Sequence, residues 1–332
     1  MVSTLRMLHC GLQALAKRPS VMLDTSTTGR QTRQESVMSA SAPSLRPAFP
    51  LRVFTEADLD TDAIVTELLE GAGAVILRDL FTAAEIAEAR RIVMAESDDD
   101  MGGAKVTHFQ GDAEKAGRIN LQRRVWNLLA KGDVFSRMAA HPAIMTVMRA
   151  FLGTEFIMGS IAANRILPGG PGQEPHIDYP YWDYHSPETH PVRINASFPL
   201  NAQVTIMLDP FTAETGATAF VPGTQRELRY PDEGDGFFDR CERMLGEAGD
   251  TVVFFGAVWH CAMPNRSRID RSAIITQYLP KFVKPMEDLP AALPAAFVKQ
   301  ASPDIRQLLG LNYPYPEVLD AARGGNKEGR GY

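Results

Sequence analysis

Three residues of this 332-residue chain are suited to bind one metal ion together: His176, Asp178 and His260. His176 and Asp178 are two residues apart, so on an extended strand both side chains leave the same face. His260 follows 82 residues after Asp178, at the end of the apolar segment 251–259. Two histidines and one carboxylate form the ligand set that holds non-haem Fe(II) and leaves coordination positions open. The spacing therefore predicts a catalytic iron site.

A buried-strand pattern also begins at Arg271, eleven residues after His260. A planar guanidinium is suited to bidentate binding of a carboxylate. Iron beside a fixed carboxylate-binding residue is the arrangement expected of a 2-oxoglutarate-dependent oxygenase. We therefore predict that Arg271 binds the C5 carboxylate of 2-oxoglutarate.

Longer segments around these residues resemble the phytanoyl-CoA dioxygenase family. They are Pro175-His-Ile-Asp178, the block Glu214-Thr-Gly-Ala-Thr-Ala-Phe-Val-Pro-Gly-Thr224 and Gly249-Asp-Thr-Val-Val-Phe-Phe255, followed by His260 and Arg271. A looser resemblance extends from about Gly73 to the segment 306–310. A lone His-x-Asp triplet is common by chance, but the ordered set is specific. The resemblance implies a double-stranded β-helix, a jelly-roll or cupin-like barrel that is mainly β with flanking helices (α+β).

The resemblance also implies a reaction. Fe(II) would be the cofactor and 2-oxoglutarate the co-substrate, and a small organic molecule, lipid-derived or natural-product-like, would be hydroxylated by O2 with release of succinate and CO2. The resemblance places Thr205 near the co-substrate. Asn164, on the strand before the metal residues, is a second candidate for contact with the co-substrate. Family members often carry a hydroxyl residue two positions after the distal histidine, where this chain has Ala262. Halogenating relatives replace the carboxylate ligand with a small residue, so Asp178 favours hydroxylation.

Aromatic residues follow the metal motif directly. Tyr179, Tyr181, Trp182 and Tyr184 come after Asp178, and Trp259 precedes His260. One hypothesis is that Tyr179, Tyr181, Trp182 and Trp259 form a wall over the substrate, which would then be partly apolar or contain a ring. The alternative is that they pack at the rim of the barrel, where Tyr and Trp keep a polar tip in water.

Composition limits the other function classes. Hydrophobic residues make up 45% and charged residues 22%, which are ordinary globular values, and the net charge of −6 argues against a nucleic-acid partner. Three cysteines, an odd number without regular spacing, do not indicate a disulfide framework and fit a reducing compartment. No segment approaches the roughly 20 apolar residues of a membrane span. Nothing in the sequence specifies an oligomeric state.

Residues 1–48 differ from the rest of the chain. They are rich in Ser, Thr, Ala and Arg, and Asp24 and Glu35 are their only acids. The segment is either a disordered leader, with Met38 a possible start, or a mitochondrial targeting segment with leucines along one helix face. In both cases we expect one dioxygenase domain over residues 49–332. The expected location is cytoplasmic, or mitochondrial if the leader is a transit peptide.

Hydrophobic periodicity predicts the elements that position these residues. We expect a helical region over 55–69, a helix that starts at the capping box Thr82-Ala-Ala-Glu85, and a helical block over 121–152. Predicted strands cover 73–78, 156–167, 203–208, 218–221, 251–259 and 273–279. Short strands separated by Gly, Pro and Asp turns indicate a sandwich or barrel.

Two other functions remain open. One is a cupin-like metalloenzyme that does not use 2-oxoglutarate, against which Arg271 counts. The other is a non-catalytic barrel, against which the complete ligand set counts.

Overall fold

The computed structural model describes residues 51–99, 121–184 and 197–313. The chain divides into two units, Met1–Leu45 and Arg46–Tyr332, and every described residue belongs to the second. The predicted leader, residues 1–48, lies outside the described residues. No helix in the described part of the chain is long and apolar enough to cross a membrane.

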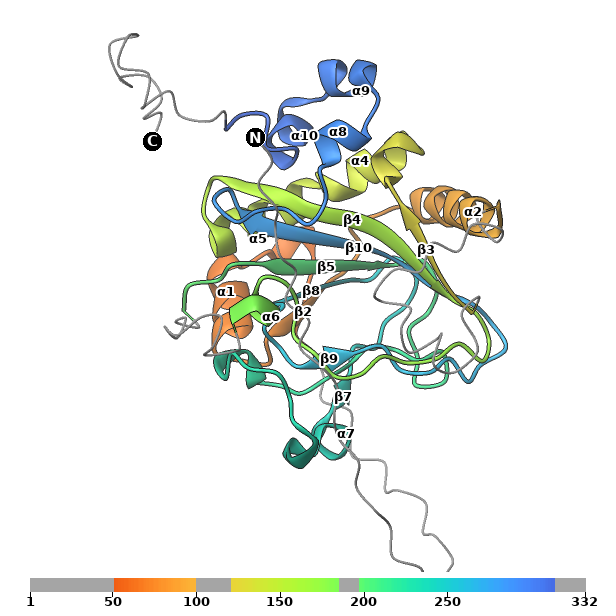
Figure 1. Cartoon of the computed structure of the whole chain (residues 1–332), viewed down its shortest axis with the longest axis vertical. Coiled ribbons are helices and arrows are strands. Elements are labelled where there is room, and N and C mark those ends of the chain that lie inside the picture. The colour runs from red at the N-terminus through yellow and green to blue at the C-terminus, as the bar shows by residue number, and fades with distance from the viewer. Residues whose placement is uncertain (1–50, 100–120, 185–196, 314–332) are drawn as a thin grey trace, which may run out of the picture. The chain divides into compact units, whose positions relative to one another are not determined.

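Two β-sheets form the centre of the described unit (Figure 1). The large sheet is antiparallel apart from its first strand pair. In spatial order it contains β1 (Val53–Phe54), β2 (Ala74–Leu77), β8 (Thr251–Phe254), β5 (Ala202–Met207), β10 (Arg271–Pro280), β4 (Phe156–Ile166) and β3 (Gln122–Trp126). The small sheet contains β7 (Glu242–Arg243), β6 (Ala219–Phe220) and β9 (His260–Cys261).

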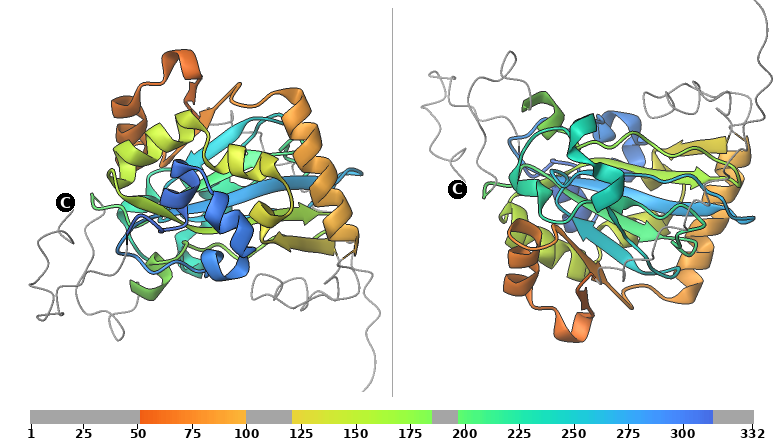
Figure 2. Two further views of the ribbon diagram at one scale, coloured as in Figure 1. Left: turned by 90° about the horizontal axis from the view of Figure 1, so that it is seen from above. Right: turned by 90° about the horizontal axis from the view of Figure 1, so that it is seen from below.

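Helices cover the face of the large sheet that is turned away from the small sheet, as Figures 1 and 2 show for α2, α4, α5 and α8 to α10. The helices are α1 (Thr61–Leu69), α2 (Ala83–Asp99), α4 (Asp133–Ala139), α5 (Pro142–Leu152), α6 (Tyr181–Tyr184), α7 (Phe237–Arg240), α8 (Leu289–Ala292), α9 (Ala295–Gln300) and α10 (Pro303–Leu308). Short 3-10 turns cover Glu56–Asp58, Leu128–Ala130, Thr224–Arg226 and Glu233–Asp235. The predicted mainly β architecture with flanking helices is confirmed.

Side-chain caps start two of the helices. The Thr82 amide donates to Glu85 Oε2 at 3.0 Å, and the Glu85 amide donates to Thr82 Oγ1 at 3.3 Å, so the capping box starts α2. His141 accepts a hydrogen bond from the Ala143 amide at the start of α5. These caps satisfy amides that have no partner inside the helix.

Two element predictions were wrong in part. Residues 122–126 form the edge strand β3 rather than the start of a helical block, because they pair with β4 in register from Gln122 opposite Ile166. The predicted strand 251–259 ends at Phe254, and a turn through Gly256 separates it from β9. Both differences come from pairing with distant strands, which local periodicity does not report.

A β-bulge interrupts the pairing of β4 with β10. Ser160 lies opposite Gln277 and Met158 lies opposite Tyr278, so Gly159 is the extra residue. Its carbonyl accepts hydrogen bonds from the amides of Met286 and Glu287, at 3.0 and 3.1 Å. Bulges bend a strand and re-aim its side chains. This one attaches the segment after β10 to the edge of β4.

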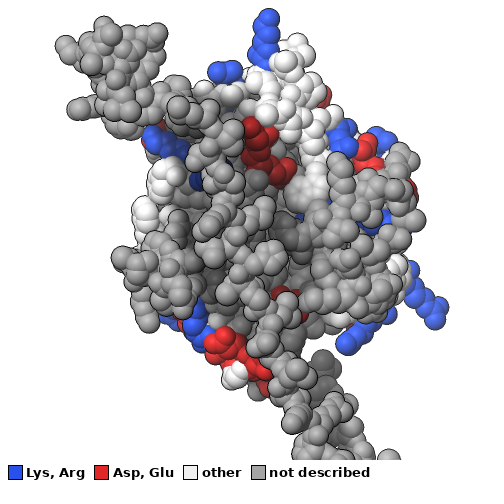
Figure 3. Space-filling model, in the orientation of Figure 1, with Lys and Arg blue, Asp and Glu red and all other residues white. Residues whose placement is uncertain are grey.

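Charged side chains are interspersed on the face drawn in Figure 3. Within its described residues, Lys and Arg alternate with Asp and Glu and form no extended patch of one sign.

Candidate active site

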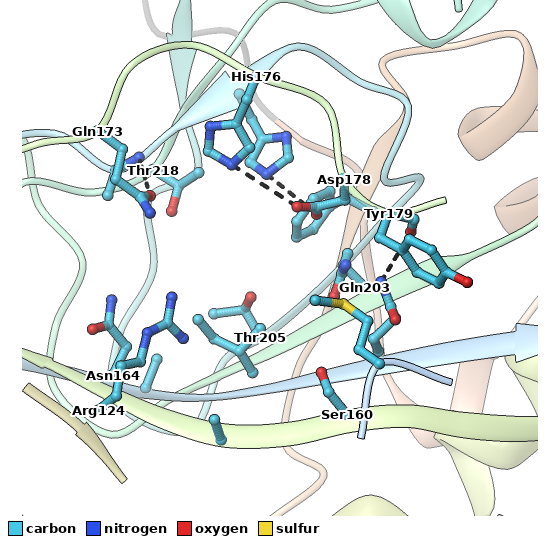
Figure 4. Close-up of a pocket in the computed structure, with 18 of the residues that line it drawn as sticks. Arg124, Ser160, Asn164, Gln173, His176, Asp178, Tyr179, Gln203, Thr205 and Thr218 are labelled. Carbon is cyan, nitrogen blue, oxygen red and sulfur yellow. Dashed lines mark hydrogen bonds and ion pairs between the residues drawn. The ribbon is translucent and has the colours of Figure 1, made fainter. Parts of the chain in front are cut away.

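The structure brings the three predicted metal ligands together. One possible ligand atom from each of His176, Asp178 and His260 lies within 4.8 Å of the others. Nε2 of His260 lies 3.3 Å from Oδ2 of Asp178. Nε2 of His176 lies 3.9 Å from Oδ1 of the same carboxylate. The side chains converge on one wall of a cavity (Figure 4). Such an arrangement can hold one ion.

Main-chain hydrogen bonds position this cluster. The His176 amide donates to the His260 carbonyl at 2.9 Å, and the His260 amide donates back at 3.0 Å. The Asp178 amide donates to the carbonyl of Gly256 at 2.7 Å. His176 therefore lies in a single antiparallel bridge rather than in the extended strand that its spacing to Asp178 suggested.

The imidazoles are oriented for metal binding. Nδ1 of His176 is 2.8 Å from the Glu174 carbonyl, and Nδ1 of His260 is 2.8 Å from the Val258 carbonyl. An Nδ1–H that donates to a carbonyl leaves the Nε2 lone pair free for a metal. Two neutral imidazoles with a carboxylate fit Fe(II).

The electrostatics of the cluster favour a bound cation. Burial, reinforced by His260, lowers the pKa of His176 to about 4 and keeps that ring neutral. Burial opposes the charge on Asp178, but the imidazoles and a hydrogen bond from Gln203 outweigh it and hold the pKa below its usual range. Burial likewise opposes charge on His260, but Asp178 outweighs it and raises the pKa above 6.5.

A buried asparagine holds the metal-binding segment in place. Asn201 is fully buried; its Oδ1 accepts from the Gly256 amide at 3.0 Å and its Nδ2 donates to the Tyr179 carbonyl. A Cβ at Gly256 would lie 2.3 Å from Asn201, so only glycine allows this approach. Asn201 thus connects the turn before His260 to the residue after Asp178.

The floor of the cavity is the inner face of the large sheet. Its side chains come from alternate strand positions, as the pleat requires. They are Arg124 and Trp126 on β3, Ser160, Ala162 and Asn164 on β4, Gln203 and Thr205 on β5, and Arg271, Ala273, Ile275 and Gln277 on β10. In Figure 4, Arg124 and Asn164 lie at one end, and Tyr179, Gln203 and Ser160 lie at the other.

The first of these ends is cationic. Arg271 is 3% exposed, and its guanidinium carbon lies 4.7 Å from the centre of the Phe211 ring. Burial and the charge of Arg124 lower the pKa of Arg271 to about 10, and burial lowers the pKa of Arg124 to about 10 against the attraction of Asp178. Both remain charged at neutral pH. No acidic side chain in the described segments pairs with Arg271, so an anionic ligand would fit there.

Most predicted site residues line this one cavity. Besides the three metal-binding candidates, it is lined by Arg271, Thr205, Asn164, Tyr179 and Trp182. Oδ1 of Asn164 has no hydrogen-bond partner among the described residues and is available to a ligand as an acceptor.

Two of the aromatic predictions were wrong. Tyr181 is 1% exposed, and its hydroxyl accepts a hydrogen bond from the Leu200 amide. Trp259 is fully buried and donates from Nε1 to the Arg229 carbonyl. Trp259 points into the core because it adjoins His260, and neighbouring extended residues face opposite sides. Neither lines the cavity.

The cavity residues that sequence reasoning missed include four polar or charged ones that matter for ligand binding: Arg124, Gln203, Gln277 and Glu287. Gln203 and Gln277 could have been found, since each lies an even number of positions from a predicted inward residue on its strand. Arg124 was hidden by the helical interpretation of its segment. Glu287 lies beyond the last strand and carries no local signal.

Comparisons with known proteins agree with this geometry. The family described as Phytanoyl-CoA dioxygenase (PhyH) matches residues 69–273. The chain belongs to this family. Its membership confirms the resemblance found in the sequence. It also confirms the predicted chemical class, an Fe(II)- and 2-oxoglutarate-dependent dioxygenase with iron as cofactor.

Individual relatives are distant. The chain is similar to Dioxygenase cdmA of Talaromyces verruculosus, 26% identical over 259 residues that cover 74% of this chain and 82% of the relative. Dioxygenase af480 of Aspergillus fumigatus is 24% identical over 197 residues, which cover 57% of this chain and 59% of that relative. The chain thus spans about three fifths of that second relative.

A solved structure is similar in fold. It is the epimerase SnoN in complex with Fe3+, alpha ketoglutarate and nogalamycin RO, at 17% identity and a TM-score of 0.50, covering 68% of this chain and 86% of SnoN. Together with the family match, this similarity confirms the predicted jelly-roll class of fold.

Replacement of Asn201 should weaken metal binding. Asn201→Ala leaves the Gly256 amide without its partner, and a buried unsatisfied group costs about 1–3 kcal/mol of unfolding free energy. The Tyr179 carbonyl keeps its second hydrogen bond, from Gln277 Nε2 at 3.0 Å. Loss of a residue that orients the ligands should lower Mn(II) affinity about 10- to 100-fold, measured by calorimetry. Gln307→Ala is the matched control, because it removes two hydrogen bonds to the carbonyls of Thr154 and Phe156 outside the cavity. Equal Mn(II) affinity in both variants would contradict the positioning role.

Metal affinity should depend on pH through His260. A metal binds only the neutral imidazole, so the proton on His260 competes with it. Because the pKa of His260 is raised above 6.5, Mn(II) affinity should fall about tenfold per pH unit below that pKa, as the pH is lowered from about 8 to about 5.5. His176 should not contribute in this range, since its pKa is about 4. An affinity that stays constant over this range would show that His260 is not a ligand.

Proposed function

We propose that this dioxygenase hydroxylates a small organic molecule with release of succinate and CO2. In this proposal His176, Asp178 and His260 hold the iron and Arg271 binds 2-oxoglutarate. The observation that carries it is the convergence of three candidate ligand side chains in the same cavity as a buried guanidinium that has no acidic partner among the described residues.

The residues of this chain divide the work between the ends of the cavity. Iron with 2-oxoglutarate, when bound, supplies the activation of O2 that is coupled to decarboxylation of the co-substrate. Arg271 orients the co-substrate by a bidentate bond to its C5 carboxylate, with Thr205 and Asn164 beside it. The attraction between Asp178 and Arg124 helps to hold both charges in place before any ligand arrives.

The opposite end of the cavity receives the substrate. Tyr179 and Trp182 line it with ring centroids 5.7 Å apart. Both are half-buried, so they offer apolar surface to a ligand and exclude water from the metal-binding face. A partly apolar or ring-containing molecule fits this lining better than a small polar acid.

Substitution of a metal ligand tests the function directly. His176→Ala removes one of three ligands, so 2-oxoglutarate-dependent O2 consumption and succinate formation should fall to the background of the metal-free protein. His141→Ala is the control: His141 caps α5 outside the cavity and should cost about 1 kcal/mol of stability while turnover persists. Succinate formation that survives in His176→Ala would refute the assigned iron site. O2 consumption that is indifferent to 2-oxoglutarate would favour a cupin-like enzyme of another kind.

Substitution of the carboxylate-binding arginine tests the co-substrate. A charge-assisted hydrogen bond contributes about 1.5–3 kcal/mol, so Arg271→Gln should raise the KM for 2-oxoglutarate by about one to two decades. Arg271→Lys should recover only part of this, because lysine cannot bind a carboxylate through a planar fork. Arg226→Gln, at an arginine outside the cavity, should leave the KM unchanged. An unchanged KM in Arg271→Gln would show that another residue binds the co-substrate.

A further inference from the structure

The substrate end of the cavity contains a carboxylate that the proposed reaction does not use. Glu287 lines the cavity, and main-chain groups hold it in place. Its amide donates to the carbonyl of the bulge residue Gly159 at 3.1 Å, and its Oε1 accepts from the Ile161 amide at 3.2 Å. The hydroxyl of Tyr179 donates to the Lys284 carbonyl at 2.7 Å. Glu287 is therefore a positioned group rather than a free surface acid.

Strand register separates Glu287 from the arginines. Ile161, which binds Glu287, lies opposite Thr276 on β10, whereas Arg271 begins that strand. Five residues of β strand span about 17 Å. A five-carbon diacid held at Arg271 does not extend to Glu287, so this carboxylate faces the substrate and not the co-substrate.

Glu287 lacks a cationic partner in the part of the chain that the structure describes. No Lys, Arg or His there lies within ion-pair distance of it. Burial raises the pKa of Glu287 to about 7 despite the hydrogen bond from Ile161. Glu287 is half-buried. A partly desolvated acid without a counter-ion is costly, and a ligand that carries a positive charge would relieve that cost.

A purely structural role does not require the charge. Glutamine has the same shape, and its side-chain oxygen would accept from the Ile161 amide without the cost of burying a carboxylate. The neighbouring aromatic residues point to the same ligand class. The rings of Tyr179 and Trp182 lie at this end, and aromatic faces attract cations.

We propose that Glu287 binds a basic nitrogen of the substrate, so that the enzyme acts on molecules that carry an amine at a distance from the oxidised carbon. This inference rests on the proposed function for the identity of the cavity as the substrate site. Binding of the amine itself requires neither iron nor 2-oxoglutarate.

A matched pair of probes tests the proposal. Benzylamine and benzyl alcohol have the same ring and nearly the same shape, and only the amine is charged at neutral pH. Their affinities are measured by calorimetry on the full chain without added metal. The wild type should bind benzylamine about 10- to 100-fold more tightly than benzyl alcohol. Glu287→Gln should bind both equally weakly, and the exposed control Glu233→Gln should behave as the wild type.

A second measurement needs no folded Gln variant. In protein labelled with 13C at its glutamate carboxyl carbons, the Glu287 resonance, assigned by its loss in Glu287→Asp, should move with benzylamine and not with benzyl alcohol. The proposal is overturned if the wild type does not prefer the amine, if Glu287→Gln keeps the preference, or if the resonance does not move. Because no metal is present, these results are independent of the His176→Ala experiment, which tests the oxygenase assignment alone.

Discussion

The reciprocal pair of main-chain hydrogen bonds between His176 and His260 is the constraint on which the site depends. The two residues are 84 positions apart, and neither belongs to a long strand. Directly opposed residues of an antiparallel pair project their side chains from the same face. The pairing therefore places both imidazoles over the cavity, with ring centroids 4.5 Å apart. Backbone pairing helps to offset the entropic cost of closing this long loop. The candidate ligand side chains are therefore already close together before a metal binds.

The cavity adds charges of opposite sign at its two ends. Burial moves the pKa of Arg271 down to about 10 and the pKa of Glu287 up to about 7, so both groups are shifted toward their neutral forms by the same cause. Groups that are poorly solvated in this way interact strongly with a ligand of complementary charge. The large sheet keeps the two charges apart, because they are attached to different positions along β4 and β10. In the proposed roles of Arg271 and Glu287, this separation would orient the ligands along the sheet as well as bind them.

Spacing and the family resemblance together predicted much of the site. The spacing to His260 identified Arg271, the resemblance identified Thr205 and Asn164, and all three line one cavity. The block from Pro175 to Asp178 identified the candidate metal-binding segment. Arg124 was missed because an edge strand is defined by its partner, β4, and not by its own pattern. The positions of Tyr181 and Trp259 were predicted wrongly for two reasons. Trp259 is one residue from His260, so its side chain faces away from the cavity. Tyr181 begins the short helix α6, which turns its side chain into the core.

The position of Glu287 could not be predicted for a further reason. It depends on a bulge at Gly159, where one extra residue in β4 frees a carbonyl that holds the chain after β10. Those bonds use main-chain groups only, so any residue except proline can make them at positions 286 and 287. Glu287 and Gln277 also lie beyond residue 273, where the family match ends, whereas the metal-binding candidates and Arg271 lie within it. The side chain at position 287, proposed to bind the substrate, is thus held by bonds that are separate from those of the residues proposed to hold iron and 2-oxoglutarate.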